Sequence, residues 1–347
     1  MNLDLLFVGT GGSAPTARRG LPAVLLQRGG EHVLIDCGEG TQRQLMRSSG
    51  LVELDLVLIT HQHTDHWLGL PGLLKTLDLR EREAPLTVAG PVGLAATVAL
   101  IWKLAGPVRY PVEVRELAPY DQIERNGWAV DAIPVRHRGT ALGYVVEEHN
   151  RPGRFDPDRA RELGVTDVQD FGRLQRGETV GDVTPDQVLG ATRFGRKIVF
   201  SGDTQPCDAV REAAWRADVL VHEATFTAEQ VERAQQTGHS TAAQAAALAK
   251  DADVGLLALT HLSARHRPSD AVAEARRIFP DTVMPRDFDM VRVPFPERGD
   301  PVHAPGAGRP ARGGPSGGSD GATLDDPEAG ADGDDDAPAA AERTDNV

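Results

Sequence analysis

The chain has few lysines and few cysteines. Only four of its 37 basic residues are lysine, namely Lys75, Lys103, Lys197 and Lys250. Low lysine with excess carboxylate is similar to the composition of proteins from high-salt cytoplasm, although a GC-rich genome that favours arginine gives the same pattern. The two cysteines, Cys37 and Cys207, lack CxxC spacing, which excludes a disulfide framework and a zinc ribbon.

Long apolar runs and a basic leader are also missing. The longest apolar stretch, residues 93–102, is too short to cross a bilayer. The first four residues, Met-Asn-Leu-Asp, lack the positive charge that opens a signal peptide. We therefore expect a soluble, cytoplasmic protein with no membrane partner.

The composition changes near residue 297. Residues 1–296 show regular apolar periodicity, whereas residues 297–347 are mainly Gly, Pro, Ala, Asp and Glu, with 12 acidic and 4 basic side chains. Such a segment buries too little apolar surface to fold, so it is expected to be a disordered acidic tail. The remaining 39 acidic and 33 basic residues give the body a net charge of −6, which argues against a non-specific RNA binder.

Within the body, short apolar runs alternate with segments of helical pattern. Strands are expected at residues 3–8, 23–27, 32–36, 56–60, 86–89, 112–117, 123–135, 142–146, 198–202, 219–222 and 255–260. Helices are expected at residues 39–47, 69–79, 242–250 and 269–278, and from residue 91. This alternation predicts an α/β fold whose sheets are covered by helices. Residues 150–177 are polar and too long for an ordinary connection, so an inserted arm or lid is favoured over a mobile surface loop.

Four of the predicted strands end on a residue that can bind a metal or transfer a proton. Residues 56–60 run into His61, residues 198–202 into Asp203, residues 219–222 into Glu223, and residues 255–260 into His261. In layered α/β proteins, ligands bind beyond the carboxyl ends of the strands. The pattern therefore predicts one metal centre built from distant segments.

The hexapeptide after residue 60 carries four potential ligands, in the order His61, His63, Asp65 and His66. Alternate residues leaving a strand can point the same way, so His61 and His63 could bind one cation, while Asp65 and His66 face another. Imidazole and carboxylate suit zinc. The alternative is a surface histidine cluster without a metal.

Two neighbouring cations need more ligands than this hexapeptide supplies. Asp203 is placed to bridge them through its two oxygens, and His261 and His137 each follow a predicted strand and can complete the sites. Each of these residues alone could instead be an ordinary hydrogen-bonded or exposed side chain. Residues 9–16 form a glycine-rich loop that could present backbone N–H groups to a phosphate or could be only a tight turn.

Several segments resemble the tRNase Z family of the metallo-β-lactamase superfamily, including its archaeal and halophilic members. The resemblance rests on HxHxDH at 61–66, FVGTGGSAPT at 7–16, DCGEGTQ at 36–42, DHWLGLPGLL at 65–74, LGY at 142–144, FSGDT at 200–204, HEAT at 222–225 and GHS at 238–240. It covers nearly all of residues 1–296 and excludes the acidic tail.

The resemblance implies an αββα sandwich with two Zn²⁺ per subunit. One zinc would be bound by His61, His63 and His137, the other by Asp65, His66 and His261, with Asp203 shared. As catalytic residues it implies Asp65, which orients the attacking water, and the pair Glu223 and His239, which protonates the leaving oxygen. The pair could instead be a buried structural contact.

The family resemblance further implies an endoribonuclease that removes the 3′ trailer of precursor tRNA. The products would be a tRNA with a 3′-hydroxyl and a trailer with a 5′-phosphate. Residues 150–177 fall where the family carries an arm that grips tRNA from the partner subunit of a homodimer. Family arms often contain a Gly-Pro pair, which residues 165–172 lack.

Two other functions use the same residues. HxHxDH alone does not separate a nuclease from another hydrolase of this fold, such as a thioesterase or a lactonase. A non-catalytic RNA-binding or partner-binding protein with a structural metal is the third reading, but binding alone needs no open metal position. The segments around Glu223 and His239 and the inserted arm favour the nuclease.

Overall fold

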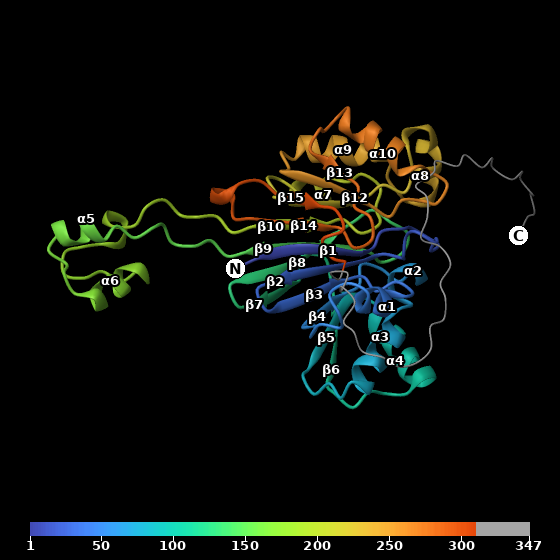
Figure 1. Cartoon of the computed structure of the whole chain (residues 1–347), viewed down its shortest axis with the longest axis horizontal. Helices are drawn as coiled ribbons and strands as arrows, with labels where there is room; N and C mark the ends of the chain where they lie inside the picture. Colours follow the sequence, from blue (N-terminus) through green and yellow to red (C-terminus); the bar gives the residue numbers. More distant parts are fainter. Residues whose placement is uncertain (310–347) are drawn as a thin grey trace, which may run out of the picture. The chain divides into compact units, whose positions relative to one another are not determined.

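The computed structural model describes residues 1–309, which form two β-sheets with helices on their outer faces (Figure 1). The first sheet has the strand order β15 (Val302–Ala304), β14 (Met290–Arg292), β1 (Leu3–Gly9), β2 (Ala23–Arg28), β3 (Glu31–Ile35), β4 (Leu56–Leu58), β5 (Leu86–Pro91) and β6 (Val112–Leu117). The second has the order β13 (Thr282–Val283), β12 (Leu256–Thr260), β11 (Val219–Glu223), β10 (Lys197–Phe200), β9 (Leu142–Glu148), β8 (Trp128–Pro134) and β7 (Gln122–Arg125).

Side-chain alternation along the strands builds three apolar layers. In β1, Leu3, Leu5 and Phe7 belong to the core between the two sheets, whereas Leu6 and Val8 pack under the helices of the first half. The same alternation in β11 sends Val219 and Val221 inward and Leu220 toward the helices of the second half. Successive residues of a strand face opposite sides of a sheet, so each sheet is apolar on both faces.

Helices cover both outer faces because most of them connect neighbouring parallel strands. The first half carries α1 (Thr41–Met46), α2 (Thr64–Trp67), α3 (Leu70–Leu79) and α4 (Leu94–Ala105). The second half carries α7 (Asp208–Ala213), η2 (Ala228–Gln230), α8 (Val231–Thr237), α9 (Ala242–Asp251) and α10 (Pro268–Arg276). The predicted αββα sandwich is confirmed.

One segment that was predicted to be a single strand forms two strands. Residues 123–135 were expected as a single strand, but β7 and β8 form a hairpin in which Arg125 pairs with Trp128. The two residues between them are Asn126 and Gly127, and Gly127 has a φ of 81°. Asn and Gly both favour turns, and glycine adopts a positive φ without steric cost. This turn divides the segment that was expected to be a single strand.

The inserted segment is an arm with its own small core, and it is longer than expected. Its helices are α5 (Pro157–Glu162) and α6 (Val168–Gln175), followed by the short helix η1 (Pro185–Gln187). Their apolar side chains form a separate buried cluster of Ala160, Val165, Phe171, Leu174, Val183 and Val188. The outgoing and returning stems pair at Arg151 with Arg193 and at Phe155 with Leu189, so the arm ends near residue 194 rather than at 177.

The boundary expected at residue 297 is also wrong. Short helix η3 (Pro296–Arg298) is followed by β15, which pairs with β14 and extends the first sheet. The ordered body therefore continues past residue 296, and the rest of the expected tail, residues 310–347, lies outside the described residues. Among residues 1–309, no helix is long and apolar enough to cross a membrane.

Candidate metal centre

The predicted ligands come together at one edge of the sandwich, where strands from both sheets end. His61 follows β4, Asp203 follows β10, and His261 follows β12 directly. His137 lies just beyond β8. Because β10, β11 and β12 are parallel, their carboxyl ends point to the same edge. The arrangement is the one that the strand-end pattern predicts.

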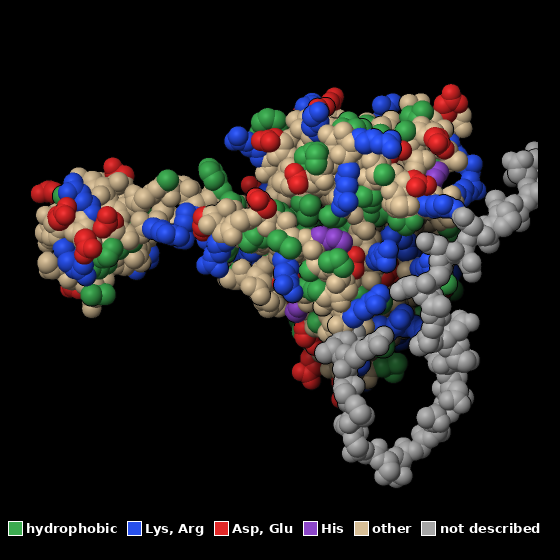
Figure 2. All heavy atoms as spheres, turned by 45° about the horizontal axis from the view of Figure 1, so that its top comes forward, with side chains coloured by type: hydrophobic (Ala, Val, Ile, Leu, Met, Phe, Trp, Pro, Cys, Tyr) green, Lys and Arg blue, Asp and Glu red, His purple; other side chains and the backbone are tan. Residues whose placement is uncertain are grey.

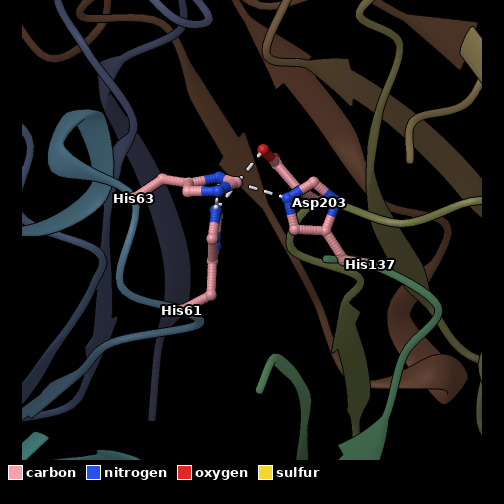
Figure 3. A group of neighbouring side chains, drawn as sticks. All are labelled: His61, His63, His137 and Asp203. Carbon is pink, nitrogen blue, oxygen red and sulfur yellow. Dashed lines mark hydrogen bonds and ion pairs between the residues drawn. The ribbon is translucent and has the colours of Figure 1, made fainter. Parts of the chain in front are cut away.

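The first group of side chains contains His61, His63, His137 and Asp203, whose ligand atoms all lie within 4.8 Å of one another (Figure 3). His63 Nδ1 lies 2.9 Å from His61 Nε2 and 3.2 Å from His137 Nε2. Asp203 Oδ2 lies 3.7 Å from His61 Nε2. Three imidazoles and one carboxylate thus converge on one point.

The second group contains Asp65, His66 and His261, also within 4.8 Å. His66 Nε2 lies 3.3 Å from His261 Nε2, and Asp65 Oδ2 lies 3.4 Å from His261 Nε2. Asp203 Oδ2 is 3.4 Å from the Nε2 atoms of both histidines, so its carboxylate borders this group as well as the first. The structure therefore brings all seven predicted ligands together and places Asp203 between the two groups.

These separations fit a tetrahedral cation. Zinc–nitrogen bonds of about 2.0–2.1 Å at the tetrahedral angle place ligand nitrogens roughly 3.3 Å apart. The nitrogen–nitrogen distances of 2.9, 3.2 and 3.3 Å match this spacing. Histidine and aspartate are also the donor set that zinc accepts. The residues present fit a metal at both groups.

Four of the five histidines in the two groups have a hydrogen-bonding partner at the ring nitrogen Nδ1. His66 Nδ1 lies 2.8 Å from Asp36 Oδ2, and His137 Nδ1 lies 2.8 Å from the Gly238 carbonyl oxygen. The corresponding atoms of His261 and His61 lie 2.9 Å from Thr225 Oγ1 and 3.1 Å from Thr60 Oγ1. Such outer partners fix the ring orientation of metal-binding histidines. The sequence argument missed them, although Asp36 follows β3 just as His61 lies beyond β4.

Burial and neighbouring charges set the protonation of the ligands. Burial lowers the pKa of His61 and of His137, and nearby imidazoles add to the effect. For Asp203 and Asp65, burial acts in the opposite direction, but the surrounding histidines hold the carboxylate pKa below its usual range. Burial also opposes the charge of His66, yet Asp203 and Asp36 outweigh it and raise the pKa of that ring. A cation at this group would compete with the proton on His66.

The buried Glu223 and the partly buried His239 form a pair beside the candidate metal ligands. His239 Nδ1 lies 2.8 Å from Glu223 Oε1, which also accepts from the Thr204 N–H at 2.9 Å. Thr225 Oγ1 donates to Glu223 Oε2 at 2.6 Å. Burial opposes the charge of His239, but the Glu223 carboxylate outweighs it and raises the pKa of His239 to about 9. The His239 ring stacks on His261 with centres 5.5 Å apart, so the pair borders the metal centre.

Comparison with known proteins agrees with this geometry. The metallo-beta-lactamase superfamily model matches residues 19–261. A ribonuclease Z from Gemmatimonas aurantiaca is 45% identical over 307 residues, covering 86% of this chain and 98% of that protein. One from Haloferax volcanii is 43% identical, covering 85% and 96%. The chain belongs to the ribonuclease Z family. The crystal structure of human tRNase Z, short form, has a TM-score of 0.62 and 29% identity, with 84% of this chain and 99% of that chain covered.

The glycine-rich loop of this ribonuclease Z family member supports the metal ligands. The Ser13 N–H donates to Asp65 Oδ2 at 2.9 Å, and Gly12 packs directly against His261. A Cβ at Gly12 would lie 2.6 Å from His261 Nδ1, which is closer than real contacts allow. Arg19 is likewise engaged, since its Nη1 donates to Thr10 Oγ1 at 2.6 Å. Of the two readings of this loop, the structure favours a tight turn that fixes ligands over a phosphate cradle.

Proposed function

We propose that this chain is the tRNA 3′-processing endoribonuclease of its family and removes the 3′ trailer of precursor tRNA. The observation that supports it most is the Glu223–His239 pair beside the two ligand groups. The chain that carries this pair is 45% identical to a ribonuclease Z over 98% of that protein's length. The cleavage would leave a 3′-hydroxyl on the tRNA and a 5′-phosphate on the trailer. We place the enzyme in the cytoplasm with its substrate.

The metal cofactor is proposed to be zinc, two ions per subunit. His61, His63 and His137 would hold one ion and Asp65, His66 and His261 the other, with Asp203 shared between them. When bound, the two ions would acidify a water molecule and offset the negative charge of the phosphate under attack.

The side chains of this chain supply the remaining parts of the reaction. Asp65 is partly buried and its Oδ2 accepts from the Ser13 N–H, so it can both bind metal and orient the attacking water. His239 is fixed through Nδ1 by Glu223, which leaves Nε2 to donate a proton to the departing 3′ oxygen. A general acid in this position contributes about 10²–10⁴-fold to the rate.

The arm is proposed to bind the body of the tRNA. Basic and acidic side chains are interspersed on the face of the arm that Figure 2 shows, and several of its arginines pair with acidic neighbours. Arg159 pairs with Glu162 at 2.9 Å and Arg173 with Asp170 at 3.1 Å. An arm neutralised in this way would recognise tRNA by shape and close contact rather than by long-range attraction.

The enzyme is proposed to act as a homodimer, and α4 supports this. Its inner face buries Leu94, Val98 and Ile101, but its outer face is also apolar and carries Leu100 and Leu104, which are 48% and 78% exposed. Lys103 is the only charged residue in the helix. A helix that is apolar all round is usually buried. Because this outer face offers almost no charge to RNA phosphates, we assign it to a second copy of the chain.

Cleavage of a precursor tRNA with a 3′ trailer tests the proposal. Wild type should release the trailer at the 3′ end of the mature tRNA body. Asp65→Ala and His239→Ala should each lose about 10²-fold or more of this activity, as expected when a metal ligand or a general acid is removed. Hydrolysis of a thioester or lactone without RNA cleavage would instead indicate another hydrolase of the same fold.

A further inference from the structure

At the root of the arm, three segments that are distant in sequence meet around one aromatic ring. Arg151 begins the outgoing stem, Arg196 ends the returning stem, and Phe295 lies between β14 and η3. The guanidinium carbons of Arg151 and Arg196 lie 3.5 and 4.0 Å from the centre of the Phe295 ring. Phe295 is 9% exposed and Arg196 is buried, so both cation–π contacts are largely shielded from water.

A carboxylate joins the same stems to the same segment. Arg151 Nη2 donates to both oxygens of Glu297, at 3.1 and 3.2 Å, and Arg193 Nη1 lies 3.9 Å from Glu297 Oε1. The two arginines also pair through their backbones, with N–O distances of 2.7 and 2.9 Å. Glu297 therefore contacts both stems at the point where they pair.

Arg196 is in turn fixed to the body. Its guanidinium donates to both oxygens of Glu148, at 2.7 and 2.8 Å, and to the Val293 carbonyl oxygen at 2.8 Å. Glu148 also accepts from Arg28 Nε at 2.8 Å, which ties the root to β2 of the first sheet. The ring of Phe295 thus rests against an arginine that is immobilised on the sandwich.

The apolar core of the arm is separate from the three apolar clusters of the sandwich. The stems approach closely beyond the root, since a Cβ at Gly153 would lie 1.9 Å from the Gly190 carbonyl oxygen. A narrow stem carries the arm helices α5 and α6 away from the body (Figure 1). A small rotation at the root would therefore move those helices far, and contacts at the root decide their direction.

We propose that Phe295 and Glu297 clamp the root of the arm and are positioning residues for precursor tRNA. The proposal rests on the proposed function, in which the arm binds the tRNA body. Without the clamp, the orientation of the arm relative to the sandwich would vary from molecule to molecule. The apparent affinity for tRNA falls by the fraction of molecules whose arm points correctly. If that fraction drops to about one tenth, KM rises about tenfold, whereas kcat for bound substrate is retained.

The test uses Phe295→Leu, which keeps an apolar side chain but removes the aromatic face, and Glu297→Gln, which removes the charge. Phe279→Leu serves as a matched control, because Phe279 is a partly buried aromatic residue packed among the second-half helices. For each protein, KM and kcat are measured on a precursor tRNA, together with hydrolysis of bis(p-nitrophenyl) phosphate. That small diester occupies the metal centre without reaching the arm.

We expect both variants to raise KM for the precursor about five- to twentyfold. Their kcat and their hydrolysis of the small diester should stay within about twofold of wild type, as should every value for the control. Equal KM values for wild type, Phe295→Leu and Glu297→Gln would overturn the proposal. So would a matching loss of small-diester hydrolysis, because this would mean that the substitutions disturb the metal centre.

Hydrogen exchange provides a readout that needs no RNA. The amides of Arg151 and Arg193 are bonded to each other's carbonyl groups, and they should exchange faster in both clamp variants than in wild type. Amides of β11 should be unchanged. If wild type cuts no precursor, the proposed function fails, but the exchange rates still decide the clamp: unaltered rates at Arg151 and Arg193 refute it.

Discussion

At the residue scale, the candidate metal ligands are arranged by side chains outside the two ligand groups. Asp36 is the clearest case, because its carboxylate lies 2.8 Å from His66 Nδ1 and also accepts from the Thr60 N–H at 2.8 Å. It has a φ of 59°, and the ligand His261 has a φ of 57°. Non-glycine residues rarely adopt this left-handed conformation, which concentrates at functional sites. The backbone thus adopts a strained conformation at Asp36 and His261, where it orients side chains of the candidate site.

Asp36→Asn tests this outer support. Asparagine keeps the shape and tolerates the left-handed conformation, but it removes the negative charge that holds His66. Replacement of such an outer partner costs about 10–100-fold in metal affinity. We expect the bound metal to be lost to a competing chelator at a correspondingly lower chelator concentration than in wild type. Asp55→Asn is the control, since Asp55 also accepts from a backbone N–H, that of His32, at 2.8 Å. An unchanged affinity in Asp36→Asn would contradict the role of Asp36.

The convergence of several candidate ligands could be predicted from sequence because they lie at or just beyond the end of a recognisable strand. His61, Asp203 and His261 are examples. Their outer partners could not be predicted in this way. Thr225 reaches both Glu223 and His261, at 2.6 and 2.9 Å, only because β11 and β12 pair in a particular register. Register between strands is a tertiary property that the local sequence does not specify.

At the element scale, the same difference between local and tertiary signals explains why the boundaries expected at residues 177 and 297 were wrong. Strand β15 has one large apolar residue, Val302, which is 55% exposed, so it joins the sheet through backbone hydrogen bonds to β14 and not through apolar burial. The returning stem of the arm, up to Arg193, likewise shows no apolar period. It is defined by pairing with Arg151 and by contacts to Glu297. Elements that depend on distant partners carry little local signal.

The ion network of Arg28 in β2, Glu148 in β9 and Arg196 just before β10 is predicted to stabilise the fold in a pH-dependent way. Burial disfavours the Glu148 carboxylate, but Arg196 and Arg28 outweigh it and lower its pKa. A lowered pKa stabilises the folded state above the unfolded value of about 4.3, and this contribution is lost as pH falls through the folded pKa. Glu148→Gln should therefore destabilise the protein by about 3 kcal/mol at pH 7, because buried guanidinium groups lose their counterion.

Urea denaturation at pH 7, 5 and 4 measures this effect. The difference in unfolding free energy between wild type and Glu148→Gln should be constant from pH 7 to 5 and should begin to shrink near pH 4. Glu124→Gln provides a control, because Glu124 pairs with His149 on the surface at 2.9 Å. A difference that does not change with pH would show that the carboxylate charge contributes nothing to stability.

At the scale of the whole molecule, the outer face of α4 and the arm both fit a homodimer. The arm leaves the sandwich on a narrow stem (Figure 1) and packs its apolar side chains in a cluster of its own. In a homodimer it could hold a tRNA whose 3′ end enters the partner's metal centre. The apolar face around Leu100 and Leu104 would then form the contact between subunits.

Leu104→Glu is expected to convert the proposed dimer into a monomer, because it places a charge in the middle of the proposed apolar contact, where burying it would be costly. Light scattering should give twice the 37.1 kDa of one chain for wild type and a single-chain mass for the variant. Since the metal centre is complete within one subunit, hydrolysis of a small phosphodiester should persist, whereas KM for precursor tRNA should rise about tenfold or more. Glu113→Gln, on the exposed side of neighbouring β6, controls for surface substitution and should leave the mass unchanged. A monomeric wild type, or a dimeric Leu104→Glu, would refute α4 as the subunit contact.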